Sequence, residues 1–123
     1  TDVTIIATGH LVWKAIEAAE QLFEKGIKAE VINIHTIKPL DNEAILKSVA
    51  KTKCVVTAEE HQILGGLGSA IAKVVSENTP APIEYVGVHD KFGESGTAEQ
   101  LLTKYGMSTQ HVVDAALKVM ARK

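Results

Sequence analysis

The 123-residue sequence is poor in the residues that mark several classes of protein. Its one cysteine, Cys54, cannot form an internal disulfide, and its place in an apolar run is typical of a small core residue in a reducing compartment rather than of a reactive thiol. Aromatic residues make up only 4% of the chain, too few to indicate a platform that stacks nucleic-acid bases. No apolar run approaches the roughly 20 residues that cross a membrane.

An excess of charge of either sign is also lacking, because the formal net charge is only −2 while charged residues make up an ordinary 23% of the chain. This balance gives no electrostatic reason to expect nucleic acid or an anionic membrane as a partner. We therefore expect neither partner, and we expect a cytoplasmic protein. The sequence opens with Thr1 and enters a strand-like run almost at once, which suggests a fragment or a trimmed product.

Short β-branched segments alternate with helical patterns along the chain. We expect strands over residues 3–7, 30–34, 54–57 and 83–88. We expect helices over 11–25, 41–51, from 67 onward, over 97–106, and from 108 or 109 onward. Gly26 is expected to end the first helix, because glycine readily adopts the left-handed αL conformation found after helix C-termini. The buried face of the first helix is predicted at Ala15, Ala18, Ala19 and Leu22, and that of the last at Val112, Val113, Ala116, Leu117 and Met120.

Strands that alternate with helices of this length predict right-handed crossovers and a sheet covered on both faces. We expect one domain over residues 1–123, with the fold of a three-layer α/β/α sandwich around a mainly parallel sheet of four to five strands.

Polar side chains gather where the predicted strands end, which is the functional edge of such a sheet. Four of the five histidines follow a strand, together with acidic residues: His10, His35, His61, His89, Glu59, Glu60 and Asp90. One interpretation is a metal or acid/base site built from His10, His61 and the two glutamates. We favour a polar edge that hydrogen-bonds its own loops and contacts another domain, because four loops would have to converge without a spacing motif.

Residues 59–75, EEHQILGGLGSAIAKVV, place a glycine cluster between this edge and an apolar helix. The cluster does not meet the dinucleotide fingerprint, because its first glycine comes late after the strand and Ile71 stands where the third should be. No Gly-Lys-Ser or Gly-Lys-Thr occurs, which excludes a Walker loop. An anion at the start of the helix stays an alternative, although Glu59 and Glu60 would repel one.

We favour packing as the role of the cluster. The start of the helix carries small residues, so that a second backbone can approach it closely: Gly66, Gly68 and Ala70. The candidate interface or loop-edge residues are therefore Glu59, Glu60, His61, Gly65, Gly66, Gly68, His10 and His35.

Four stretches together resemble the C-terminal domain of transketolase, over nearly the whole chain and in one order. They are TIIATGHLVWKAIEAAE (4–20), INIHTIKPLD (32–41), VVTAEEHQILGGLGSAIA (55–72) and DKFGESGTAEQLLTKYGM (90–107). The resemblance is closest to split transketolases, whose two halves are separate chains. The same domain type occurs in deoxyxylulose-phosphate synthase and in the beta subunit of 2-oxoacid dehydrogenases. The FGESG turn favours transketolase, and His35 stands where the dehydrogenase subunits more often carry Arg.

The resemblance implies an enzyme that uses thiamine diphosphate and Mg²⁺ to move two-carbon ketol units between sugar phosphates. It implies a cofactor held by companion diphosphate-binding and pyrimidine-binding domains, in the same or a separate chain, and a homodimer of the complete enzyme. This domain would support the dimer and the framework, with no catalytic, cofactor-binding or metal-binding residue of its own. The residues agree, since the chain has no Gly-Asp-Gly and its one arginine is Arg122.

One alternative of another class stays open, a free-standing module that binds an anion or a nucleotide at the start of the helix near Leu67. A receiver-like signalling domain is excluded, because it needs an acidic pair after the first strand, where Thr8-Gly9-His10 stands instead.

Overall fold

The computed structural model describes residues 2–8, 11–34, 42–62, 67–88 and 109–123, with only the backbone at 60–62, 67, 87 and 88. These residues form one parallel sheet of four strands in the order β2-β1-β3-β4. The strands are β1 (Val3–Ala7), β2 (Ala29–Asn33), β3 (Val55–Gln62) and β4 (Ile83–Val88). The order reverses between β1 and β3, and in such a sheet this switch point is where ligands usually bind.

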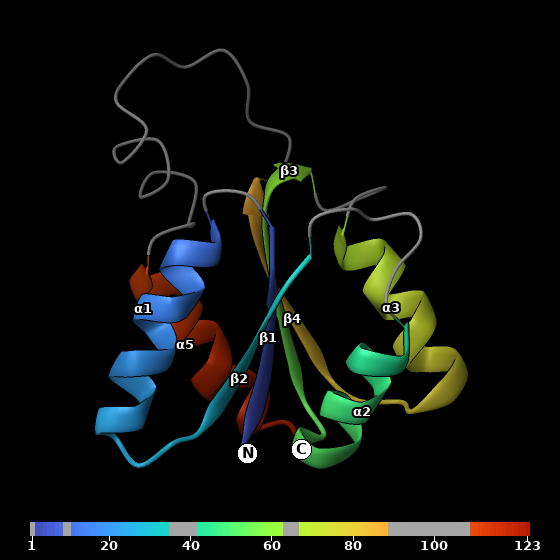
Figure 1. Ribbon diagram of the computed structural model, residues 1–123, viewed down its shortest axis with the longest axis horizontal. Coiled ribbons are helices and arrows are strands. Elements are labelled where there is room, and N and C mark those ends of the chain that lie inside the picture. Colours follow the sequence, from blue (N-terminus) through green and yellow to red (C-terminus); the bar gives the residue numbers. More distant parts are fainter. Residues whose placement is uncertain (1, 9–10, 35–41, 63–66, 89–108) are drawn as a thin grey trace.

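Helices cover both faces of the sheet. They are α1 (Leu11–Glu24), α2 (Asn42–Thr52), α3 (Leu67–Asn78) and α5 (Thr109–Met120). Helices α1 and α5 lie on one face, and α2 and α3 lie on the other (Figure 1). The three-layer prediction is therefore confirmed, while the helix expected over 97–106 lies outside the described residues.

The central strand β1 joins the two halves of the core. All five of its residues are buried, and Val3, Ile5 and Ala7 pack into the cluster under α1 and α5. Ile6 packs into the other cluster, under α2 and α3. Such two-sided burial explains why the strand reads as a continuous apolar run.

The one polar residue of β1, Thr4, is buried and fully provided with partners. Its hydroxyl lies 2.8 Å from the hydroxyl of Ser48 and 2.6 Å from that of Thr52, both on α2. The Thr52 hydroxyl in turn donates to the Cys54 carbonyl at 3.1 Å. This chain of hydroxyls fixes α2 on the sheet, because a buried polar group without a partner costs stability.

The end of β3 and the buried face of α5 differ from what was expected. β3 was expected to end at residue 57, but it continues to Gln62, with a register irregularity against β4 between Ala58 and Gln62. The polar residues that suggested a loop are accommodated in the strand because the Glu59 side chain has a partner inside the fold. In α5, Val119 is buried, whereas Leu117 is 40% exposed and Met120 is half-buried, because the face towards the sheet runs through residues 112, 116 and 119.

The end of α1 agrees with its sequence. Gly26 has a φ of 82°, as predicted for a left-handed glycine that ends a helix. The amides of Gly26 and Ile27 donate to the carbonyls of Phe23 and Leu22, both at 2.9 Å, which is the pattern of a Schellman motif. On this helix Leu11 is buried with Ala15, and Ala19, which was expected in the core, is half-buried.

Candidate functional site

The carboxyl ends of the strands at the switch point are joined by their own backbone groups. The amide of Thr8, directly after β1, donates to the Ala58 carbonyl of β3 at 3.1 Å. On the other side, the amide of Ile34 donates to the Ala7 carbonyl at 3.0 Å. The amide of Leu11 donates back to the Thr8 carbonyl at 3.2 Å and begins α1. This part of the edge therefore hydrogen-bonds within the chain, as the favoured interpretation requires.

Glu59 lies in β3 and is only 2% exposed. Its carboxylate oxygen Oε1 accepts a hydrogen bond of 3.1 Å from the backbone amide of Gly68, in the first turn of α3. A carboxylate is favourable there, because the first amides of a helix lack partners within the helix and carry a partial positive charge. The structure therefore places Glu59 within a strand, where we expected a loop edge, and buries its side chain.

This contact bears on whether the N-terminus of α3 can bind an anion. An anion or a cofactor diphosphate at a helix N-terminus binds through the free amides of the first turn. In this chain the buried Glu59 carboxylate already accepts from one of those amides, and its charge repels a second anion. Among the described residues, the start of α3 therefore does not fit a phosphate or diphosphate group.

Gly68 is also closely packed at this edge. An added Cβ would lie 2.7 Å from Cδ1 and 2.9 Å from Cε1 of Tyr85, and 3.4 Å from the hydroxyl of Thr57. The close approach predicted for this glycine is therefore confirmed. The expected partner was wrong, since the group that approaches is the ring of Tyr85 from β4 rather than a second backbone.

The sequence reading missed Tyr85 and Thr57 as partners of Gly68. Thr57, Tyr85 and Gly68 lie on β3, β4 and α3, and the register aligns Thr57 with Tyr85 directly. Only the register of β3 against β4 could have shown that the side chains of Thr57 and Tyr85 lie on the same face of the sheet. The ring that fills the space above a glycine is not visible in the glycine motif itself.

The other candidate residues are placed only in part. The backbones of Glu60 and His61 lie in β3, and His10, His35, Gly65 and Gly66 lie outside the described residues. Within the described ranges no group of three or more His, Cys, Asp or Glu residues is arranged to hold a metal ion. The absence of a metal in the whole chain stays a prediction. None of the described helices is long and apolar enough to cross a membrane.

The family of the chain is shown by comparison with known proteins. The model of the family "Transketolase, C-terminal domain" matches residues 1–112. The chain belongs to this family. A 6-deoxy-6-sulfo-D-fructose transketolase subunit, SqwH, from a Clostridium species is 52% identical over 122 residues, which are 99% of this chain and 38% of that protein. A 1-deoxy-D-xylulose-5-phosphate synthase from Geobacter sulfurreducens is 40% identical over 99% of this chain and 20% of that protein.

A solved structure gives the same assignment for this transketolase C-terminal domain. A split-gene transketolase, described as an inactive beta4 tetramer, superimposes with a TM-score of 0.93 at 49% identity. The match covers 98% of this chain and 39% of that one. The transketolase C-terminal domain thus spans about two fifths of the length of these split-type relatives.

Proposed function

We propose that this chain is the C-terminal domain of a thiamine-diphosphate-dependent transketolase, which in its complete form moves two-carbon ketol units between sugar phosphates. The observation that carries the proposal is the match of the family model to residues 1–112, together with a split-transketolase relative that is 52% identical over 99% of the chain. The complete enzyme is proposed to use Mg²⁺ with its cofactor. The sugar that it carries depends on parts of the enzyme outside this chain.

Within that enzyme, we assign the domain to assembly and framework rather than to the chemistry. The contact between Glu59 and Gly68 supports this role. A backbone amide at the start of α3, which could otherwise bind a cofactor phosphate, donates instead to a carboxylate of the domain itself. The cofactor would then be held by the companion diphosphate-binding and pyrimidine-binding domains. No catalytic step is assigned to a residue of this chain.

The companion domains are proposed as its partners, in the same or in a separate chain. The relative SqwH is named a subunit, and the structural relative comes from a split gene, which supports a separate diphosphate-binding chain. A homodimer of the complete enzyme in the cytoplasm is part of the same proposal. The proposed interface or loop-edge residues stay Glu60, His61, Gly65, Gly66, His10 and His35, whereas Glu59 and Gly68 are assigned to packing within the domain.

The test is ketol transfer from xylulose 5-phosphate, with thiamine diphosphate and Mg²⁺ present in every arm. The arms are this chain alone, the companion domains alone, and both together. We expect no turnover by this chain alone and more turnover by the mixture than by the companion alone. Turnover by this chain alone, dependent on the added cofactor and metal, would overturn the assignment.

The same domain of a deoxyxylulose-phosphate synthase is the second candidate, favoured by the 40% identical synthase from Geobacter sulfurreducens. The assembled enzyme can be assayed for formation of 1-deoxy-D-xylulose 5-phosphate as well. That product, formed without ketol transfer between sugar phosphates, would select the second candidate.

A further inference from the structure

The strand β4 lies at one edge of the sheet. It pairs with β3 on one side, and no strand pairs with it on the other in the part of the chain that the structure describes. The amide of Val55 on β3 donates to the carbonyl of Pro82 at 3.0 Å. Because backbone groups alternate in direction along a strand, those of Ile83, Tyr85 and Gly87 point away from β3.

Such a row of outward backbone groups can pair with a strand of another chain. The edge is complementary to itself, so a second copy of the chain is a ready partner. A two-fold axis between the copies makes the paired strands antiparallel. The arrangement that uses every outward group of β4 sets Tyr85 opposite Tyr85 of the second copy, and Ile83 opposite its Gly87.

A side chain that follows α5 occupies the start of this edge. Nη1 of Arg122 donates to the Ile83 carbonyl at 3.1 Å, and the same nitrogen forms an ion pair with Oε2 of Glu84. Nζ of Lys118 lies 3.4 Å from Oε1 of that carboxylate. Because the Ile83 carbonyl points away from β3, the guanidinium of Arg122 lies where a pairing strand would have to donate.

The packing of α5 fixes Arg122 in this place. Val119 of α5 and Val86 of β4 belong to one buried cluster, which holds the helix on the strand. Beyond the helix, the amide of Ala121 donates to the Leu117 carbonyl at 3.2 Å, and that of Arg122 donates to the Val119 carbonyl at 3.0 Å. The end of α5 thus lies at the end of the sheet where the strands begin (Figure 1).

The ion pair alone does not explain this placement. The Arg122 side chain is 49% exposed, and an exposed ion pair contributes little to stability. Lys118 already supplies the Glu84 carboxylate with a cation, and that carboxylate is only 18% exposed. The bond to the Ile83 carbonyl is the feature that neither charge requires, and it acts on the edge of the sheet.

We propose that Arg122 closes the β4 edge against pairing with a second copy of this chain. In the symmetric pair, each guanidinium occupies the Ile83 carbonyl that the Gly87 amide of the other copy would need. Both ends of the pair are then blocked, and only the contact between the two Tyr85 residues is left. So short a paired stretch is marginal in water. Edge closure concerns association rather than the reaction, so it does not depend on the proposed function.

The test removes Arg122 without leaving the Glu84 carboxylate unpaired. Glu84→Gln is the matched control, because it removes the ion pair and keeps the bond from Arg122 to the Ile83 carbonyl. The double variant Glu84→Gln/Arg122→Met also removes the donor. Sedimentation equilibrium measures the association constant of each. We expect the control to associate as the wild-type chain does, and the double variant about tenfold or more strongly, because each freed carbonyl gains a backbone hydrogen bond.

A third substitution ties the association to β4. Gly87→Pro removes the amide that would meet the Ile83 carbonyl of the second copy, and proline is tolerated on an edge strand where the amide faces solvent. Added to the double variant, it should return the association constant to the wild-type value. Association of the double variant at the wild-type level would overturn the proposal. So would association that Gly87→Pro does not reverse, or an equal gain in Glu84→Gln alone.

Amide hydrogen exchange supplies a readout that needs no variant. In the wild-type chain, the outward amides of Tyr85 and Gly87 should exchange at rates that do not change with protein concentration, because the edge stays closed. Protection of these two amides that rises with concentration would show that the edge pairs in spite of Arg122, and would overturn the proposal whether or not the double variant folds. The Val86 amide, which faces β3, is the internal control and should be protected at every concentration.

Discussion

At the scale of single residues, several buried polar groups of the described fold have a partner from a distant part of the chain. Glu59 meets the start of α3, and Thr4 meets two hydroxyls of α2. Cys54 belongs to the same group, because its Sγ donates to the Asp2 carbonyl at 3.3 Å. Burial raises the pKa of this thiol, and the thiolate is the reactive form, so Cys54 is a core residue as predicted. The residue types were visible in the sequence, but their partners were not.

Gly68→Leu should destabilise the domain by about 1–3 kcal/mol, because the new side chain collides with the Tyr85 ring. Urea unfolding measures the change in the free energy of unfolding. The control is the same substitution in a Tyr85→Ala background, where the space beside the glycine is open and the cost should be smaller. An equal cost in both backgrounds would show that the ring is not what restricts this position.

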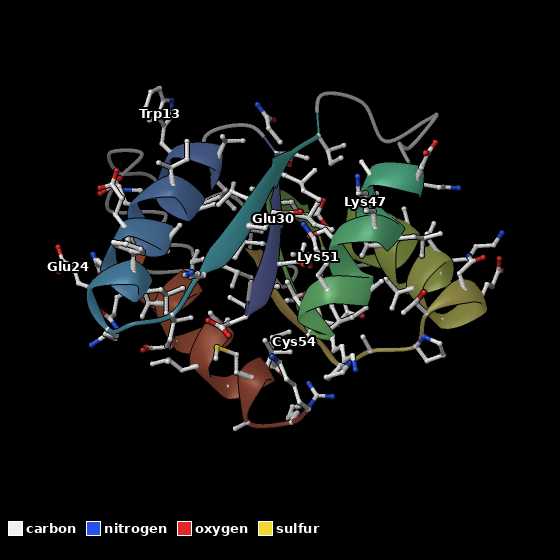
Figure 2. The ribbon with its side chains drawn as sticks, turned by 60° about the horizontal axis from the view of Figure 1, so that its bottom comes forward. Trp13, Glu24, Glu30, Lys47, Lys51 and Cys54 are labelled. Atoms are coloured by element: carbon white, nitrogen blue, oxygen red, sulfur yellow. The ribbon has the colours of Figure 1, made fainter. Side chains whose placement is uncertain are left out.

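Glu30 supplies a prediction about pH. A hydrogen bond from the Lys51 side chain, followed by one from Ser48, holds the pKa of the Glu30 carboxyl below its ordinary value. Lys51 Nζ lies 2.8 Å from Glu30 Oε2, and Figure 2 shows the two residues side by side. A lowered pKa in the folded state stabilises the fold above the unfolded-state pKa, and this contribution is lost as the pH falls through the folded-state pKa.

Glu30→Gln should therefore lower the Tm slightly at pH 7 and should reduce the fall in Tm between pH 6 and pH 3. The effect is small, because an exposed ion pair contributes about 0.2–1 kcal/mol. Lys51→Met is the matched control and should reduce the same acid-dependent fall. If wild type and both variants lose Tm in parallel on acidification, the pair does not contribute in this way.

At the scale of helices and strands, the sequence predicted well where the pattern is local. The bounds expected for β1 and β4 agree with the structure, because each is a β-branched run between polar residues. β3 ran longer than expected because Glu59 is stabilised by the amide of Gly68, which is a contact across the fold. In the candidate site, Gly68 was identified from its motif, whereas Tyr85 was not, because strand pairing decides which ring lies over it.

Two helix ends in the described part of the chain carry a positive φ and give a paired prediction. Lys53 follows α2 with a φ of 62°, and Gly26 follows α1 with a φ of 82°. Lys53→Gly should stabilise the domain by about 0.5–1 kcal/mol, because glycine adopts this conformation without steric cost. Gly26→Ala should destabilise it by about 1 kcal/mol, and this cost is conformational, since no atom lies within 4 Å of the added Cβ.

Thermal unfolding of both variants checks the pair. The Lys53 amide keeps its 2.7 Å bond to the Val49 carbonyl in either case, so a change in hydrogen bonding does not confuse the result. A loss of stability in Lys53→Gly would mean that the lysine side chain contributes more than its backbone strain costs.

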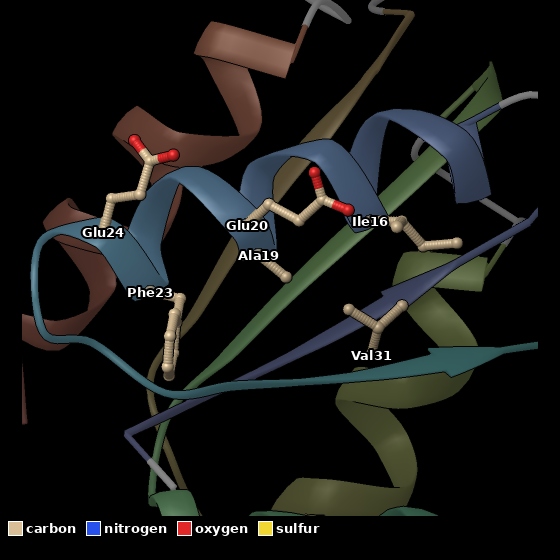
Figure 3. A pocket seen from close by; sticks show the side chains of 6 residues that line it. All are labelled: Ile16, Ala19, Glu20, Phe23, Glu24 and Val31. Carbon is tan, nitrogen blue, oxygen red and sulfur yellow. The ribbon is translucent and has the colours of Figure 1, made fainter.

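At the scale of the whole molecule, the described fold combines a carboxyl edge that hydrogen-bonds within the chain with an apolar cavity at its flank. The carboxyl edge is joined by the hydrogen bonds of Thr8, Ile34 and Glu59. The open cavity at the flank lies between α1 and β2, and its lining is mainly apolar, with two glutamates at its margin (Figure 3). A domain whose own chemistry took place at the switch point would be expected to present free donors there. The described amides at this edge instead donate to carbonyl and carboxylate groups of the same chain.

The isolated chain should therefore bind neither thiamine diphosphate nor an adenine nucleotide. Titration calorimetry with each ligand in the presence of Mg²⁺ should give no saturable heat, because the Glu59 carboxylate accepts the Gly68 amide that an incoming phosphate would need. Glu59→Gln removes the charge but keeps an acceptor, so it separates repulsion from occupation of the amide. Weak phosphate binding gained by Glu59→Gln alone would show that charge excludes the anion. Saturable binding of a nucleotide by the unaltered chain would favour the free-standing ligand module over a supporting domain. In that case we would expect the bound nucleotide to displace the Glu59 carboxylate from the start of α3.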